Sequence, residues 1–200
     1  YTDNDGLLQV WPGWDAEAQT THTIDYLRKR DSENPFCLFL SWGPPHHPYR
    51  LVPQEYMDMY DPDTIEGRPN CPDVPRDDLW GYYAQTTFLD DQFQRLLDTI
   101  NNLGIEDETI IVFTSDHGDM HGSHGVYKKQ WPWSEALKVP FVVRYPNIVP
   151  QGAILDAPLS VIDIMPTLLE ESGLSIPEGV QGRSLFEGTS EVYAWESHEG

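Results

Sequence analysis

Short apolar runs alternate with longer amphipathic stretches along this chain. Residues 110–113 and 139–144 are short and rich in β-branched residues, which is typical of strands. The run at residues 110–113 has the pattern of a strand buried on both faces, as in a parallel sheet, and residues 36–40 form a similar run that we expect to be a second buried strand. Residues 15–30 and 77–103 place apolar side chains three and four apart, which predicts amphipathic helices. This alternation predicts an α/β fold with a largely parallel sheet sandwiched by helices.

The remaining segments give weaker signals. We expect a short helix near residues 54–60, a helix over 160–172 that ends at Gly173, and a last strand at 192–195. We interpret residues 1–200 as one partial domain. Three of its segments are expected to differ from the regular core: an irregular segment at 1–14, a proline-rich surface excursion at 51–76, and the start of a C-terminal region at 174–200.

Composition and charge narrow the class of protein. The 200 residues are 39% hydrophobic and carry a formal net charge of −21, which argues against nucleic acid and anionic membranes as partners. No apolar run approaches the length of a membrane span. The chain begins with Tyr1 rather than Met, so we expect a piece of a longer protein. Of the two cysteines, Cys37 is expected to be a buried core thiol and Cys71 to be incidental.

Chemically informative residues follow the strand at 110–113 directly. Asp116 and His117 stand where that strand should end, and ligands of α/β proteins bind beyond the carboxyl ends of strands. A carboxylate and an imidazole can share one divalent cation. The alternative is an Asp that caps the following turn beside an exposed His. Gly118 and Gly122 then indicate a loop that turns sharply or approaches a bound group.

Two further groups could hold an anion in this acidic chain. Lys129 follows the glycine-rich loop, and His46 lies in a turn whose prolines restrict the backbone. From the residues alone, a solvated lysine and an exposed histidine are the favoured interpretations.

The order of these motifs carries a family resemblance. Ser115-Asp116-His117-Gly118, then Gly122-Ser123-His124-Gly125, then Lys129, then Val139 to Pro146 resemble the C-terminal part of the sulfatase catalytic domain. That family belongs to the alkaline-phosphatase-like superfamily. The resemblance implies an alkaline-phosphatase-like fold, incomplete at the N-terminus, and a sulfuric ester hydrolase.

The resemblance also implies roles for individual residues. Asp116 and His117 would be metal ligands, with Ca²⁺ expected and Mg²⁺ less so. Lys129 and His46 would be catalytic, the lysine on a sulfuryl oxygen and the histidine on the sulfate or the leaving oxygen. His47, at the variable position of the Pro-His-x-Pro turn, and His124 would bind substrate.

Two neighbouring features stay less defined. His121 is expected to be exposed. The segment Trp131-Pro132-Trp133 could line a pocket for a sugar or aryl group, or could pack in the core.

Two family features are absent from the sequence. The Cys/Ser-x-Pro-x-Arg motif, whose first residue becomes formylglycine, does not occur; the segment from Cys71 to Arg76 has its proline and arginine misplaced. The N-terminal Asp-Asp metal pair is also missing, and Asp90 and Asp91 on the long predicted helix are interpreted as a solvated or capping pair. We therefore expect formylglycine only in the parent protein, with an N-terminal part of the same domain as partner, and little activity from these residues alone.

The substrate expected from the resemblance is a sulfated small molecule or carbohydrate, and export from the cytoplasm is expected by analogy. Two alternatives remain open: a phosphonate or phosphate ester hydrolase of the same superfamily, and a catalytically incompetent scaffold that binds a metal or an anion.

Overall fold

The structure, a computed structural model, describes residues 6–7, 10, 13–154 and 158–186. The chain divides into two compact units. The first comprises residues 1–108 and 117–139, and the second comprises residues 109–116 and 140–200.

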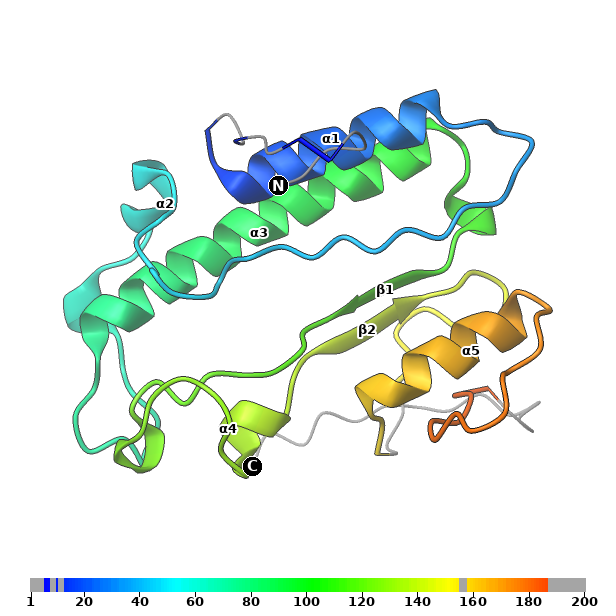
Figure 1. Cartoon of the computed structure of the whole chain (residues 1–200). Helices are drawn as coiled ribbons and strands as arrows, with labels where there is room; N and C mark the ends of the chain where they lie inside the picture. The colour runs from blue at the N-terminus through cyan, green and yellow to red at the C-terminus, as the bar shows by residue number, and fades with distance from the viewer. Residues whose placement is uncertain (1–5, 8–9, 11–12, 155–157, 187–200) are drawn as a thin grey trace. The chain divides into compact units, whose positions relative to one another are not determined.

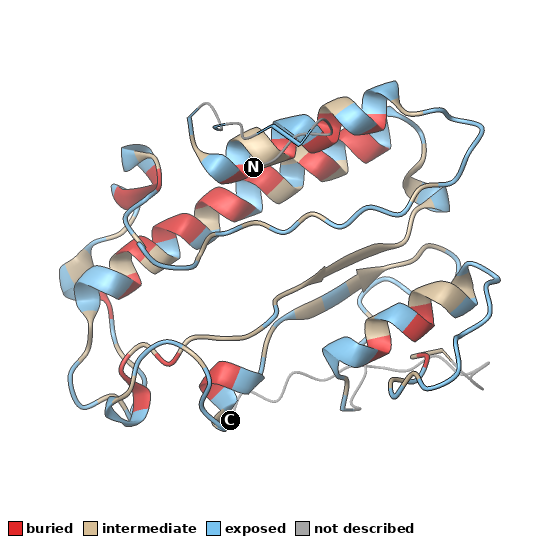
Figure 2. Cartoon of the chain, viewed as in Figure 1, coloured by how far each residue is buried: buried red, intermediate tan, exposed pale blue. Residues whose placement is uncertain are grey.

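Three helices organise the first unit: α1 (Asp15–Lys29), α2 (Gln54–Met57) and α3 (Arg76–Asn102). All three expected helices are thereby confirmed, although α2 is shorter than predicted. α1 lies beside the second half of α3 (Figure 1), and Arg95 Nη2 donates to Thr21 Oγ1 at 2.9 Å between them. Their facing stripes are buried (Figure 2), so the periodicity of the sequence decided the packing. The main apolar cluster consists of Ala16, Val52, Tyr56, Met57, Ala84, Phe88 and Leu89.

Short helical turns complete the chain between these elements. In the first unit they are η1 (Pro62–Thr64), η2 (Glu106–Glu108), η3 (Ser123–Gly125) and α4 (Ser134–Leu137). The excursion at 51–76 thus contains α2 and η1 and is otherwise irregular.

The second unit contains the sheet. β1 (Ile111–Thr114) and β2 (Phe141–Arg144) confirm two of the predicted strands. They pair antiparallel, with Ile111 opposite Arg144 and Thr114 opposite Phe141. β1 is only half-buried, so the expected burial on both faces is wrong for this strand. Among the described residues this is the sheet's one ladder, so the parallel pairing expected for these strands is wrong for this pair. The apolar run of β1 was compatible with either direction of pairing, because direction depends on partners distant in sequence.

A capped helix packs on this sheet. η4 (Val161–Asp163) leads into α5 (Ile164–Glu171), where the sequence predicted a helix. Ser160 and Asp163 form a capping box, and Asp163 Oδ1 also accepts from the Arg183 backbone N–H at 3.0 Å. Ile164 and Leu168 of α5 face the apolar side chains of β1 and β2.

The strand expected at residues 36–40 does not form. These residues have no regular secondary structure, Phe39 is 81% exposed, and Cys37 is exposed rather than a core thiol. An apolar run becomes a buried strand only when neighbouring strands pair with it, and within the first unit's described residues no strand does so. The last predicted strand, 192–195, lies outside the described residues. No helix in the described part of the chain combines the length and apolarity that crossing a bilayer requires.

Candidate active site

Lys129 and His46 are in direct contact in the first unit. Lys129 Nζ lies 2.7 Å from His46 Nε2, and His46 Nδ1 lies 2.7 Å from the carbonyl oxygen of His47. Because a carbonyl oxygen can only accept, the imidazole proton is assigned to Nδ1, and Nε2 then accepts from the lysine ammonium. The two residues chosen from separate motifs as anion ligands therefore form one pair, a charged lysine beside a neutral histidine.

The turn that carries His46 is seated on α3. A Cβ at Gly81 would lie 2.5 Å from the carbonyl oxygen of Tyr49, so only glycine permits this approach of turn to helix. Gln85 Nε2 donates to the carbonyl oxygen of Pro48 at 3.0 Å. The peptide bonds Pro44–Pro45 and His47–Pro48 are both cis. The position of His46 is thus set by contacts of its neighbours with a long helix.

The loop that carries Lys129 is a folded-back segment. The backbone N–H of Met120 donates to the carbonyl oxygen of Lys128 at 2.8 Å, and that of Gly122 donates to Val126 at 2.9 Å. Met120 is fully buried and holds the loop to the unit. These bonds bring Met120 beside Lys128 and Gly122 beside Val126, so the first and last parts of the loop are neighbours.

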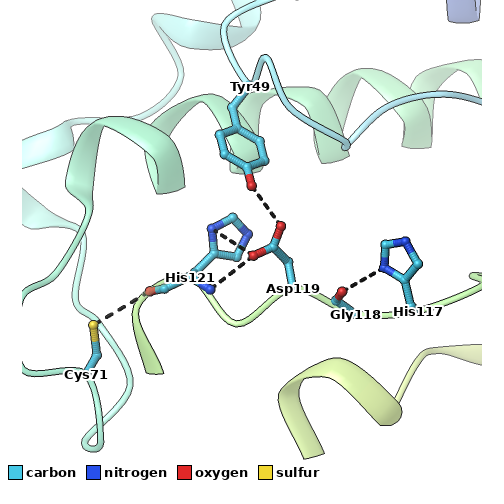
Figure 3. A network of polar contacts seen from close by, with 6 residues as sticks. All are labelled: Tyr49, Cys71, His117, Gly118, Asp119 and His121. Carbon is cyan, nitrogen blue, oxygen red and sulfur yellow. Dashed lines mark hydrogen bonds and ion pairs between the residues drawn. The ribbon is translucent and has the colours of Figure 1, made fainter. Parts of the chain in front are cut away.

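A polar contact ties this loop to the turn (Figure 3). Tyr49 Oη donates to Asp119 Oδ2 at 2.7 Å, and the backbone N–H of His121 donates to Asp119 Oδ1 at 3.1 Å. Neither Tyr49 nor Asp119 was singled out from the sequence, although each directly follows a motif that was. Their place immediately beyond Pro-His-His-Pro and Asp-His-Gly was the available signal.

His121 is not exposed, contrary to expectation. Its side chain is 12% accessible and its ring packs edge-on against Tyr82 at 4.4 Å and beside Tyr49 at 5.2 Å. Burial lowers the pKa of His121, although Asp119 opposes this. The aromatic partners come from distant segments, so nothing local to His121 predicted its burial.

His47 lies beside His46 in the turn, and its pKa responds to the charges around it. Its ring lies 4.3 Å from that of His46 and remains exposed. Lost hydration lowers the pKa of His47, and the neighbouring His46, Lys128 and Lys129 lower it further, while Asp119 opposes them. A locally positive region in a chain of net charge −21 suits an anion.

His124 belongs to a separate polar cluster of the same unit. Asn70 Nδ2 lies 2.7 Å from Glu135 Oε1 and 3.0 Å from His124 Nε2. The Asn70 hydrogen bond lowers the pKa of the buried Glu135. The sequence did not predict Asn70 and Glu135 as a pair. Their contacts place His124 in a hydrogen-bonded cluster of the loop.

Trp131 and Trp133 form an aromatic stack with His124. The ring of Trp133 lies 4.4 Å from that of His124, and Trp131 lies 5.5 Å from Trp133, with interplanar angles of 21° and 20°. Trp131 is 40% exposed. Of the two interpretations that the sequence left open, core packing is wrong for Trp131.

Asp116 and His117 are adjacent in the chain but belong to different units. Asp116 follows β1 and is exposed, and Ser115 Oγ lies 3.4 Å from its Oδ1. His117 Nδ1 lies 2.8 Å from the carbonyl oxygen of Gly118, so its proton is assigned to Nδ1 and its lone pair to Nε2. A ring held in this way fits metal binding through Nε2. Across the described ranges no group of three or more His, Cys, Asp or Glu residues could hold a metal ion, so these two donors fit only part of a coordination sphere.

Known proteins resemble the chain over most of its length. The family model described as Sulfatase matches residues 2–174. An ulvan-active sulfatase of Formosa agariphila is 37% identical over 94% of this chain and 38% of its own length. An endo-4-O-sulfatase of Bacteroides thetaiotaomicron is 32% identical over 92% of this chain and 39% of its own length.

Solved structures agree with these matches. A structure from work on glycosaminoglycan metabolism by Bacteroides thetaiotaomicron superposes with a TM-score of 0.87 at 32% identity, over 96% of this chain and 44% of that one. A phosphonate monoester hydrolase of Silicibacter pomeroyi superposes with a TM-score of 0.74 at 25% identity, over 92% of this chain and 44% of that one. The chain spans about two fifths of the length of the curated relatives named here.

Proposed function

The chain belongs to the sulfatase family, its α/β fold is alkaline-phosphatase-like, and from this premise we propose that the protein containing it hydrolyses sulfate esters. In that reaction the S–O ester bond breaks, water supplies the new oxygen on sulfur, and the leaving oxygen takes a proton. The observation that carries the proposal is the contact of Lys129 Nζ with His46 Nε2 at 2.7 Å.

Lys129 holds the sulfuryl group in this proposal. An ammonium has three N–H donors, and His46 accepts one of them, which leaves two for sulfuryl oxygens. Because His46 fixes the direction of the ammonium before substrate binds, little reorganisation is needed when charge develops on those oxygens. Removing one such preorganised donor typically costs about 10²–10³ in kcat.

His46 itself lies beside the group that Lys129 holds. Its Nδ1–H is fixed by the His47 carbonyl, so Nε2 faces the ammonium. We assign His46 to contact the sulfate or the leaving oxygen, which requires its Nε2 to take up a proton and to exchange Lys129 for the substrate oxygen. His47, exposed at the variable position, is assigned to contact the remainder of the substrate.

Asp116 and His117 are the proposed metal ligands of this chain, and Ca²⁺ is the proposed ion. The carboxylate suits a hard cation, while the tautomer assigned to His117 gives a nitrogen lone pair. When bound, the cation supplies Lewis-acid polarisation of the sulfuryl oxygens. Formylglycine, which the family resemblance implies, supplies the nucleophile when present, and no residue of this sequence is assigned that role.

A sulfated carbohydrate is the proposed substrate class. The relatives include an ulvan-active sulfatase and an endo-4-O-sulfatase, and the exposed face of Trp131, held by its stack on Trp133, suits a sugar ring. Replacing Trp131 by Ala should raise KM for a sulfated oligosaccharide and leave KM for a small aryl sulfate within about twofold. Equal effects on both substrates would contradict this assignment.

A phosphonate monoester hydrolase is the second candidate, because such an enzyme superposes on this chain and the Lys129–His46 pair suits any tetrahedral anion. Purified full-length protein should be assayed side by side on 4-nitrophenyl sulfate and a 4-nitrophenyl phosphonate ester, with Ca²⁺ present. A larger kcat/KM on the sulfate supports the proposal, and a larger value on the phosphonate favours the alternative. A third candidate, a non-catalytic scaffold, predicts calorimetric binding of Ca²⁺ or sulfate without turnover of either ester.

A further inference from the structure

Two contacts join the turn at residues 44–49 to the loop at residues 117–129. One is Lys129 with His46, and the other is Tyr49 Oη with Asp119 Oδ2, both at 2.7 Å. The hydrogen bond from Met120 N–H to the Lys128 carbonyl connects the loop residues of the two contacts at 2.8 Å. The two segments are therefore fastened at two adjacent points, of which only one involves the anion-holding pair.

The Tyr49–Asp119 contact is held from both sides. Asp119 Oδ1 accepts from the backbone N–H of His121 at 3.1 Å while Oδ2 accepts from Tyr49. The ring of His121 packs against both Tyr49 and Tyr82, and a Cβ on Gly81 would collide with the Tyr49 carbonyl oxygen. Tyr49 is therefore held against α3, and the Asp119 carboxylate is held by both Tyr49 and His121 (Figure 3).

The contact also keeps one protonation pattern. Burial, and then the hydrogen bond to Asp119, raise the pKa of Tyr49. The phenol consequently remains a donor across the neutral range.

We propose that Tyr49 and Asp119 are positioning residues, which set the approach of Lys129 to His46 through the Tyr49 hydroxyl and the Asp119 carboxylate. This inference rests on the proposed function, in which that pair holds the sulfuryl group. In this proposal neither residue touches the substrate. Releasing their hydrogen bond frees the turn and the loop to separate, and a pair misplaced by about 1 Å costs up to 10²-fold in rate.

The protein offers a matched control. Tyr56 Oη donates to Asp91 Oδ2 at the same distance, 2.7 Å, between α2 and α3. The variants Tyr49→Phe and Tyr56→Phe each remove one tyrosine hydroxyl bonded to one carboxylate and leave the ring packing in place. Both are introduced into the full-length protein, alone and together with His46→Ala, and kcat and KM are measured on 4-nitrophenyl sulfate. Imidazole ¹⁵N signals are recorded for each histidine-labelled variant.

We expect Tyr49→Phe to lower kcat about tenfold with KM changed less than about threefold, and Tyr56→Phe to leave both within about twofold. In the His46→Ala background, Tyr49→Phe should lower kcat by less than about twofold, because the imidazole that Tyr49 is proposed to position is already absent. The His46 ¹⁵N signals should move in Tyr49→Phe and stay in Tyr56→Phe.

Equal kinetics of the two variants, the same loss in both backgrounds, or unmoved His46 signals would overturn the positioning role. Failure of the unmutated protein to turn over the sulfate ester would instead contradict the proposed function, and the histidine spectra would still decide whether Tyr49 positions His46.

Discussion

Lys129 Nζ lies 2.7 Å from His46 Nε2 although 83 residues separate them in the chain. The contact joins a proline-rich turn seated on α3 to a glycine-rich loop anchored by buried Met120. A fixed imidazole acceptor orients the ammonium, and the exposed His47 beside it feels the same positive charge. The chemistry proposed for this chain depends on that one contact.

The seat of the turn on α3 should fail when Gly81 gains a side chain. In Gly81→Ala the new methyl group would meet the Tyr49 carbonyl oxygen at 2.5 Å, and backbone cannot yield as a flexible side chain can. We expect a loss of about 1–3 kcal/mol in the free energy of unfolding, with a fall in kcat/KM, measured by urea denaturation and initial rates. Gln94→Ala, exposed on the same helix, is the control, and equal behaviour of the two variants would contradict the close seat.

Much of the fold was predictable because the signals were local. The periodicity of α3 and the stop at Gly104, which has a φ of +66°, lie within one stretch of sequence. The run at residues 36–40 has the composition of a strand, but pairing depends on distant partners, and the run is exposed here. The local sequence pattern therefore predicted the helices more accurately than the sheet.

The candidate site was likewise predictable where the signal was local and not where it came from distant segments. Motif order selected Lys129 and His46, and their contact confirms that the two belong together; their catalytic roles stay predictions. Tyr49 and Asp119 escaped notice because a tyrosine–carboxylate contact between distant segments leaves no spacing to read. His121 was misjudged for a related reason, since its burial comes from tyrosines outside the loop.

The Asn70 amide should be replaceable neither by a methyl group nor by a carboxylate. It donates to Glu135 and lies within hydrogen-bonding distance of His124, so Asn70→Ala leaves the buried carboxylate without this donor, at a cost of about 1–3 kcal/mol. Asn70→Asp places a like charge beside Glu135 and should destabilise more. Urea midpoints of the two variants decide the order, and an Asp variant as stable as the unmutated protein would show that Glu135 does not need the donor.

His121 should make stability depend on pH. Burial lowers its pKa below the 6.5 of the free side chain, so below about pH 6.5 the unfolded chain binds more protons than the folded one. The free energy of unfolding should therefore be full above that pH and fall as the pH is lowered through it. His121→Asn, which tolerates the φ of +41° at this position, should show a smaller decline between pH 7.5 and 5.5 than the unmutated protein. Identical slopes would mean that the ring does not titrate differently on folding.

Asp116 should contribute to calcium affinity. In the full-length protein, Asp116→Ala removes one proposed oxygen ligand and should weaken Ca²⁺ binding at least about tenfold in calorimetric titration. Asp90→Ala removes an exposed carboxylate of α3 and should leave the affinity unchanged. Unaltered binding by the Asp116 variant would remove this residue from the proposed site.

The neighbouring residues Lys128 and Lys129 provide a matched test of whether Lys129 holds the sulfuryl group. Lys128 is exposed, and its side chain is assigned no role, so Lys128→Ala and Lys129→Ala differ by one position in the same loop. The measurement is kcat/KM of both full-length variants on 4-nitrophenyl sulfate. We expect a loss of about 10²–10³-fold for Lys129→Ala and a change within about twofold for Lys128→Ala. Unchanged turnover in Lys129→Ala, or an equal loss in both variants, would contradict this role of Lys129.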